Sequence, residues 1–197
     1  MSQVLEREDL GADAAVAEPA PAPVLRAPLS GSRLEAAKGD RPLRILLPSY
    51  RSNPTTGGQG VYMRHIAKAL ADMGHEIDVI SGPPYPVLDP RVKLIKLPSL
   101  DLYANPHPIK ALRPWMLATP IDLYEWWSHN TGGFSEPYPF CERMARYVRG
   151  TVDDYDICHD NQTLGWGLLK LRDMGLPIVG TIHHPITMDR RIDIQHA

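Results

Sequence analysis

The stretch "NPTTGGQGVYMRHIAKALADMGHEIDVISGPP", residues 53–84, decides the fold of this chain. It begins with a glycine-rich turn, continues with the apolar spacing of an amphipathic helix and ends in a short apolar strand. The apolar run Leu43–Leu47 precedes it and has the length of a strand buried on both faces. Together these segments predict one strand–helix–strand unit of a parallel sheet, with the usual right-handed crossover.

The helix of this unit is expected over Val61–Met73, with Gly74 as its C-terminal cap. The strand that follows is expected over Glu76–Ser81. The spacing i, i+4, i+7, i+8 and i+11 places one set of apolar residues on the face turned to the sheet. These residues are Tyr62, Ile66, Ala69, Leu70 and Met73.

The rest of the chain repeats the alternation of strand and helix. Further strands are expected over Val92–Pro98, Tyr155–His159 and Ile178–Ile182, and further helices over Tyr138–Val148 and in the segment that ends at Gly175. The fold class is therefore α/β, with a doubly wound, mostly parallel, Rossmann-like sheet. Residues 1–40 are rich in Ala, Pro and acids and predict a disordered leader, so the folded domain is expected over 41–197. Residues 99–136 read as an irregular, aromatic insertion with two short helices.

Composition excludes several classes of function. The net charge of −2 over 197 residues gives no basic footprint for nucleic acid. The chain has two cysteines, and they form no CxxC pair. This pattern predicts neither a structural zinc site nor a disulfide framework, and it favours a reducing compartment. No secretory signal or membrane span is visible, so a cytoplasmic protein is expected. Contact with the inner face of the membrane stays open, because Arg64, His65 and Lys68 suit either anionic lipid or solvent.

Four polar or glycine-rich segments follow predicted strands. They are Gly57/Gly58, Ser81/Gly82, Asp160/Asn161 and His183/His184. Ligands of doubly wound sheets bind at the carboxyl ends of the strands, close to the point where the strand order reverses. The sequence therefore predicts a binding crevice at this edge.

The glycines allow two interpretations of equal weight. The segment "GGQG", Gly57–Gly60, matches neither the dinucleotide-binding nor the phosphate-binding loop pattern. It can serve as a tight strand-to-helix turn. It can instead bring backbone amides at a helix N-terminus close to an anion.

The other candidate residues also have competing interpretations. His183 and His184 are neighbours on a strand and point to opposite sides, so they predict no metal site. Asp160 fits a cap of the following helix better than a general base. Trp126 and Trp127, together with Trp115, suit either a platform for sugar or lipid or a small satellite core.

Taken together, "RILLPSY", "TTGGQGVYMRHIAKALADMGHEIDVISGPP", "YDICHDN" and "PIVGTIHHP" resemble the N-terminal domain of the retaining family 4 glycosyltransferases, which have the GT-B architecture. The resemblance covers residues 43–188. It implies that Gly57, Gly58 and Gln59 lie against the donor diphosphate and the acceptor, and that His183 is the catalytic residue that reaches the transferred sugar. The acceptor-side candidates are the residues Asp160, Asn161, Trp126 and Trp127.

The resemblance further implies transfer of a sugar from a nucleotide-sugar donor to a saccharide, lipid or small-molecule acceptor, with no metal or other cofactor. Enzymes of this family hold the nucleotide with a second domain that carries a Glu-x7-Glu motif. That motif is missing from the sequence, so the domain is expected to be incomplete at its C-terminus and inactive alone. A non-catalytic binding module and a related sugar-nucleotide epimerase are the alternatives.

Overall fold

The computed structural model describes residues 41–55, 58–104, 113–114, 118–133, 135–163 and 165–183. The predicted leader, Gly57, Trp115 and His184 lie outside these ranges. Five strands form one sheet in the order β3-β2-β1-β4-β5, and every neighbouring pair is parallel. The strands are β1 (Arg44–Ser49), β2 (Glu76–Ser81), β3 (Lys93–Lys96), β4 (Ile157–Asn161) and β5 (Ile178–Thr181).

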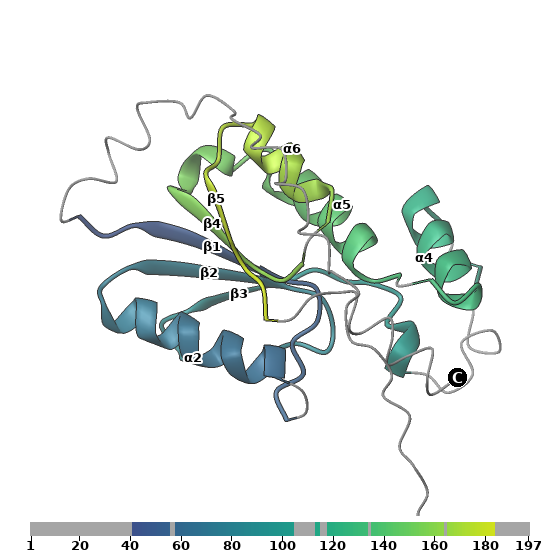
Figure 1. Ribbon diagram of the computed structural model, residues 1–197, viewed down its shortest axis with the longest axis horizontal. Coiled ribbons are helices and arrows are strands. Elements are labelled where there is room, and N and C mark those ends of the chain that lie inside the picture. The colour runs from purple at the N-terminus through teal and green to yellow at the C-terminus, as the bar shows by residue number, and fades with distance from the viewer. Residues whose placement is uncertain are drawn as a thin grey trace, which may run out of the picture.

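Helices cover both faces of the sheet (Figure 1). One face carries α2 (Gly58–Asp72), and the other carries α5 (Pro137–Val148) and α6 (Gly167–Asp173). The fourth helix, α4 (Pro120–Asn130), packs against α5 at the far end of the insertion. Two short 3-10 helices complete the described elements, η1 (Leu102–Ala104) and η3 (Val152–Asp154). The prediction of a doubly wound α/β fold is confirmed.

The sheet divides the core into two layers, because alternate residues of a strand point to opposite faces. On β1, Ile45 and Leu47 join the layer under α2, where Met63 and Ala67 meet them. Leu46 points the other way and joins the larger layer under α5 and α6. All three β1 side chains are buried, which explains why this strand reads as a continuous apolar run.

The inner face of α2 was predicted in part: Ile66 and Leu70 pack against the core, but the centre of the buried face lies elsewhere on the helix. Gly60, Met63 and Ala67 are its buried residues, whereas Ala69 and Met73 are exposed. Small side chains let a helix approach a sheet closely, so glycine and alanine mark the contact line here. A count of large apolar residues gives them too little weight.

The prediction for β4 was displaced by two residues. The strand begins at Ile157, after the 3-10 helix η3 and its C-cap residue Tyr155, and it includes Asp160 and Asn161. The next residue, Gln162, has a φ of 53°, and this left-handed conformation turns the chain out of the sheet. The predicted helix ends at Gly74 and Gly175 are confirmed, because both glycines have positive φ angles just after α2 and α6.

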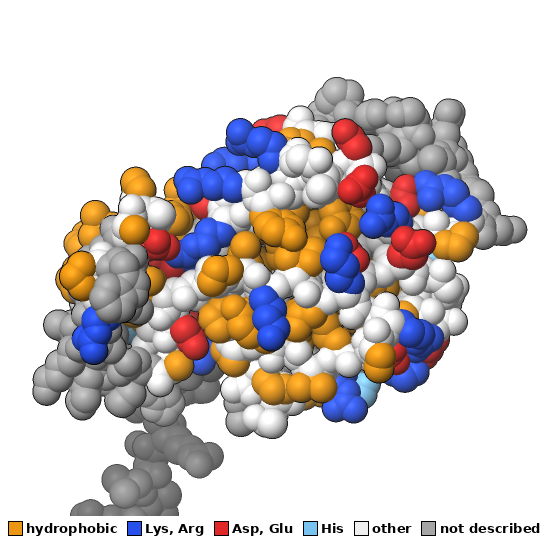
Figure 2. All heavy atoms as spheres, turned by 180° about the vertical axis from the view of Figure 1, so that it is seen from behind, with side chains coloured by type: hydrophobic (Ala, Val, Ile, Leu, Met, Phe, Trp, Pro, Cys, Tyr) orange, Lys and Arg blue, Asp and Glu red, His pale blue; other side chains and the backbone are white. Residues whose placement is uncertain are grey.

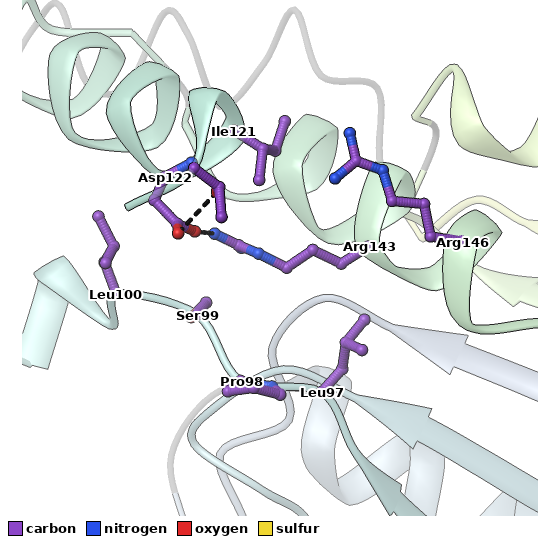
Figure 3. Close-up of a pocket in the computed structure, with 9 residues that line it drawn as sticks. Leu97, Pro98, Ser99, Leu100, Ile121, Asp122, Arg143 and Arg146 are labelled. Carbon is purple, nitrogen blue, oxygen red and sulfur yellow. Dashed lines mark hydrogen bonds and ion pairs between the residues drawn. The ribbon is translucent and has the colours of Figure 1, made fainter. Parts of the chain in front are cut away.

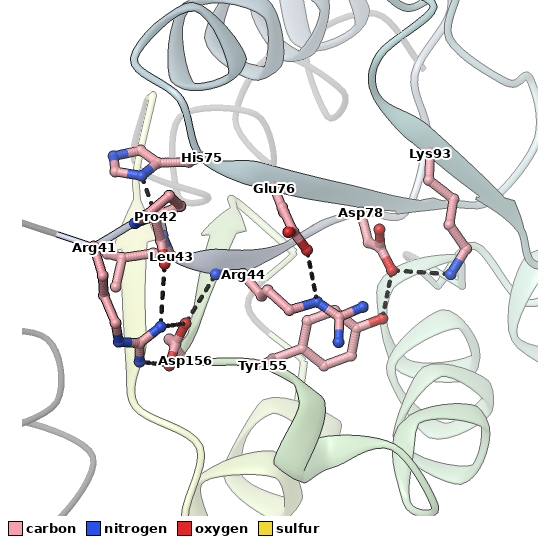
Figure 4. A network of polar contacts seen from close by, with 10 residues as sticks. All are labelled: Arg41, Pro42, Leu43, Arg44, His75, Glu76, Asp78, Lys93, Tyr155 and Asp156. Atoms are coloured by element: carbon pink, nitrogen blue, oxygen red, sulfur yellow. Dashed lines mark hydrogen bonds and ion pairs between the residues drawn. The ribbon is translucent and has the colours of Figure 1, made fainter.

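Polar side chains tie the strands together at their amino-terminal ends (Figure 4). Tyr155 donates a hydrogen bond of 2.8 Å to the largely buried carboxylate of Asp78, which also pairs with Lys93 at 3.1 Å. Burial and this bond to Asp78 raise the pKa of Tyr155. Asp156 accepts from Arg41 and from the amide of Arg44. The carboxylates of Asp78 and Asp156 are therefore both paired, and they stabilise the amino-terminal edge of the sheet.

We expect Tyr155→Phe to lower the free energy of unfolding by about 1.5–3 kcal/mol, the usual contribution of a hydrogen bond to a charged group. The substitution removes the hydroxyl group that donates to Asp78, and Tyr155 is buried. Tyr147→Phe is the matched control, because Tyr147 is exposed. Urea unfolding of both variants measures the difference, and equal midpoints would show that the buried bond adds no stability.

Candidate functional site

The strand order reverses between β1 and β4, and the two strands separate there. Their pairing covers only Ile45↔Ile157 and Leu46↔Cys158. By contrast, β1 and β2 stay paired to the end of both strands, and so do β4 and β5. The carboxyl ends of β1 and β4 are therefore not paired with each other at the switch point, which is where ligands of such sheets bind.

Buried hydroxyl groups fix the loops that leave β1 and β2. Ser52 donates to Ser49, whose own hydroxyl donates to the carbonyl of Arg51. Ser81 donates to the carbonyl of Gly82, and the amide of Gly82 donates to the carbonyl of Ser49. These bonds hold the two loops together at this edge of the sheet.

The glycines of the loop before α2 have different roles. A Cβ at Gly60 would collide with the backbone oxygen of Asn53, so this glycine is required for the packing of α2 against the loop after β1. Among the described residues, nothing lies within 4 Å of a Cβ built at Gly58, and Gly58 has no positive φ. No described residue therefore requires glycine at position 58.

The amino end of α2 suits an anion. The first amides of an α-helix have no partner within the helix, and the helix dipole favours negative charge near them. The first turn of α2 carries no acidic side chain that would compete. Gln59 extends from this turn, and its amide lies 3.4 Å from the hydroxyl of Tyr50.

His183 lies just past β5 and is held from three sides. Its Nε2 is 2.6 Å from Oδ1 of Asn161, at the end of β4. Its backbone amide donates to Oε1 of Gln162 at 2.8 Å. The ring of Tyr62, from α2, meets the imidazole edge to face with centroids 4.6 Å apart. The helical spacing of apolar residues predicted Tyr62 on the face of α2 turned to the sheet. Such spacing does not indicate a contact between two rings.

The structure places the two acceptor-side candidates of β4 on opposite faces of the sheet. Asn161 shares the α2 side with His183, whereas Asp160 is buried toward α5 beside the thiol of Cys141. The preferred cap interpretation of Asp160 is wrong, because α6 begins at Gly167 without a side-chain cap. Asp160 instead accepts from the amide of Thr163 at 3.0 Å and closes the turn after β4.

The two tryptophan candidates belong to α4. Trp127 is exposed, with Leu123 one turn earlier on the same helix, and Trp126 is half-buried. Figure 2 shows the face opposite to that of Figure 1, where hydrophobic side chains gather at the centre with Lys and Arg side chains among them. Trp126 and Trp127 lie on α4, the helix of the insertion that packs against α5.

A pocket of about 400 Å³ lies between the chain leaving β3 and the helices α4 and α5 (Figure 3). Arg143 crosses it and bonds to the carboxylates of Asp122 and Glu125. Glu125 also accepts from the amide of Leu100, so one ionic cluster joins the three segments. The remaining lining is largely apolar, with Arg146 at the margin.

Glu136 is another charged group that the sequence did not indicate. It precedes α5, its side chain is mostly buried, and it faces Arg51 of the loop after β1 at 3.7 Å. Burial raises the pKa of Glu136 to about 7, although Arg51 acts in the opposite direction. This carboxyl group therefore titrates near neutral pH at the edge of the site.

Two further properties concern the described part of the chain only. None of its helices has the length and hydropathy to cross a bilayer. No three His, Cys, Asp or Glu side chains within the same residues gather closely enough to bind a metal ion.

Comparison with known proteins gives three findings. Residues 56–195 match the family model of Glycosyltransferase Family 4. The chain is 52% identical, over 156 residues, to the MMP alpha-(1->4)-mannosyltransferase of Mycolicibacterium hassiacum; the match covers 79% of this chain and 38% of that protein. The crystal structure of LpCGTa in complex with UDP is similar with a TM-score of 0.39 and 14% identity, over 71% of this chain and 30% of that one.

We expect Gly60→Ala to destabilise the fold by about 1–3 kcal/mol, the range for overpacking a closely packed contact, because its new methyl group meets the backbone of Asn53. Gly58→Ala is the matched control from the same helical turn and should change the stability little, since nothing occupies the space beside it. Thermal unfolding of both variants tests this. Equal melting temperatures would contradict the division of roles between the two glycines.

We expect the stability of the chain to fall as the pH rises from about 4.5 to about 7, in part because of Glu136. A carboxyl whose pKa is raised on folding binds its proton more tightly in the folded state, so its contribution is lost as the proton leaves. Glu136→Gln should weaken this pH dependence and stabilise the fold at pH 8 by about 1–3 kcal/mol. Glu76→Gln, at an exposed position, controls for the loss of one negative charge. Parallel pH profiles for all three proteins would exclude Glu136 as the cause.

Proposed function

Because the chain belongs to glycosyltransferase family 4, we propose that its protein transfers a sugar from a nucleotide-sugar donor to an acceptor hydroxyl, with retention of configuration and in a GT-B architecture. The chain spans 38% of the length of its mannosyltransferase relative. The identity of 52% over most of the chain supports mannose as the transferred sugar and an α-(1→4) linkage as the product.

One observation carries the proposal: the open amino end of α2 and the imidazole of His183 lie on the same side of the sheet, joined through Tyr62. Tyr62 is in the second turn of the helix whose first turn holds Gly58 and Gln59. A diphosphate beside the first-turn amides would leave its attached sugar within reach of the region of His183. An anion at the helix end followed by a sugar near His183 would have the order of groups of a nucleotide-sugar.

The chemistry that this arrangement suits is electrostatic. When the bond between the sugar and the diphosphate breaks, negative charge grows on the leaving phosphate. Preorganised amides at a helix end stabilise such charge without reorganisation of solvent. We assign this role to the backbone at Gly57, Gly58 and Gln59, the orientation of the sugar to His183, and no role to a metal ion. None of the residues described at this edge is assigned as a catalytic base.

The proposal is tested by incubating the complete protein with a panel of labelled nucleotide-sugars and saccharide acceptors, with and without EDTA. We expect transfer from a mannose nucleotide, an α-linked product by NMR and the same rate in EDTA. Transfer of a different sugar would correct the donor. Donor epimerisation without transfer, or no turnover of any donor, would contradict the proposed reaction.

We expect His183→Ala to lower kcat/KM by about 10²–10³-fold, the effect of removing one preorganised polar group from a transition state. Gly58→Val should also reduce transfer strongly while leaving the fold intact, because its side chain would fill space that the fold leaves open. His65→Ala, on an exposed position of α2, is the control. If the His183 and Gly58 variants keep the kcat/KM of the control, this edge of the sheet is not the transfer site.

A further inference from the structure

Asn161 stands out among the residues around His183 because its side chain is buried and incompletely paired. Its exposed fraction is 1%, and its Oδ1 lies 2.6 Å from Nε2 of His183. Its Nδ2 is also buried, and among the described residues it has no hydrogen-bond partner. Asn161 is the last residue of β4 and bonds to His183, which lies two residues after the end of β5.

A buried amide donor without a partner disfavours the folded state. An apolar side chain of similar size at position 161 would avoid that cost and would still fill the space, but it would lose the bond to His183. The contact with His183 is therefore what distinguishes asparagine from an apolar residue at this position. Local departures from complete hydrogen bonding are expected where a site needs a particular group.

The group that Asn161 presents to His183 is a hydrogen-bond acceptor. An amide oxygen cannot donate a proton, so the bond requires a proton on Nε2 of the imidazole. In a neutral ring only one nitrogen is protonated, and the bond made by one nitrogen decides the state of the other. Nδ1 is then unprotonated and available to accept a hydrogen bond.

We propose that Asn161 is a positioning residue that fixes the tautomer of His183, so that Nδ1 accepts a hydrogen bond from a hydroxyl group of the transferred sugar. The inference rests on the proposed function of His183. Two contacts support the fixed orientation: Gln162 holds the backbone amide at 2.8 Å, and the Tyr62 ring packs against the imidazole at an interplanar angle of 78°. Rotation of the ring would break both the Asn161 bond and the Tyr62 contact.

The chain provides a matched control in a second histidine bond between β4 and β5. Nε2 of His159 lies 2.8 Å from Oγ1 of Thr181. His159 is two residues before Asn161, and Thr181 is two residues before His183. Thr181→Val removes this bond with little change in side-chain shape. It should affect the ring of His159 and leave the ring of His183 unchanged.

The first experiment observes the ring protons by NMR of the chain labelled with ¹⁵N-histidine, with His183→Gln used for assignment. We expect a protected Nε2–H proton on His183 and no proton on Nδ1. Asn161→Ala should abolish the protected signal, and Thr181→Val should retain it. A proton on Nδ1 of His183, or an unchanged Nε2–H signal in Asn161→Ala, would overturn the proposal whatever the protein transfers.

The second experiment measures kcat/KM of the complete protein. Asn161→Ala should lower it by about tenfold, a typical coupling between contacting groups, and should have no further effect in a His183→Ala background. An equal loss in both backgrounds would show that Asn161 does not act through His183 and would overturn the proposal. If the NMR result holds but neither variant alters transfer, both the proposed function of His183 and the positioning role are refuted.

Discussion

The contact between Gly60 and the backbone of Asn53 is the constraint on which the site depends, because it sets the position of α2. Only a residue without a side chain allows this approach, which brings the amino end of the helix against the loop after β1. Met63 and Ala67 then continue the contact along the sheet. Tyr62, on the neighbouring face of the same turn, is carried to the ring of His183. One steric requirement thus determines both where an anion would sit and how the histidine is packed.

Alternation along β4 separates the functions of adjacent residues. Cys158 and Asp160 point toward α5, where Cys158 joins the apolar core and Asp160 closes a turn by bonding the amide of Thr163. His159 and Asn161 point toward the side of α2, and both bond to residues at or after the end of β5. The β1–β4 pairing ends at Leu46↔Cys158, so the last three residues of β4 are not paired with β1. The same five residues therefore stabilise the core on one face and line the candidate site on the other.

The sequence predicted the fold class and most of the element positions because β1 and β2 are apolar on both faces and Gly74 and Gly175 mark helix ends. It predicted only part of the inner face of α2: Ile66 and Leu70 pack on the core, but Gly60 and Ala67, which make contact through their small size, were missed. The ligand site at the carboxyl edge, with His183 and the glycine loop, stays a prediction. The contacts of His183 with Asn161 and Tyr62 join positions far apart in sequence, so no local spacing indicates them. The raised pKa of Glu136 likewise depends on burial by the insertion.

Hydrogen bonding differs between the two edges of the sheet. At the amino-terminal edge, the buried carboxylate of Asp78 is paired with both Tyr155 and Lys93. Among the described residues, the buried side-chain atoms without partners include those of Asp101, Trp126, Ser135, Asn161 and Thr163, all in the insertion or at the carboxyl end of β4. At the carboxyl end of β4, the unpartnered Nδ2 of Asn161 belongs to the side chain that bonds to His183. Such a departure from complete hydrogen bonding is expected where a site needs a particular group, whereas the paired groups of the amino edge maintain the fold.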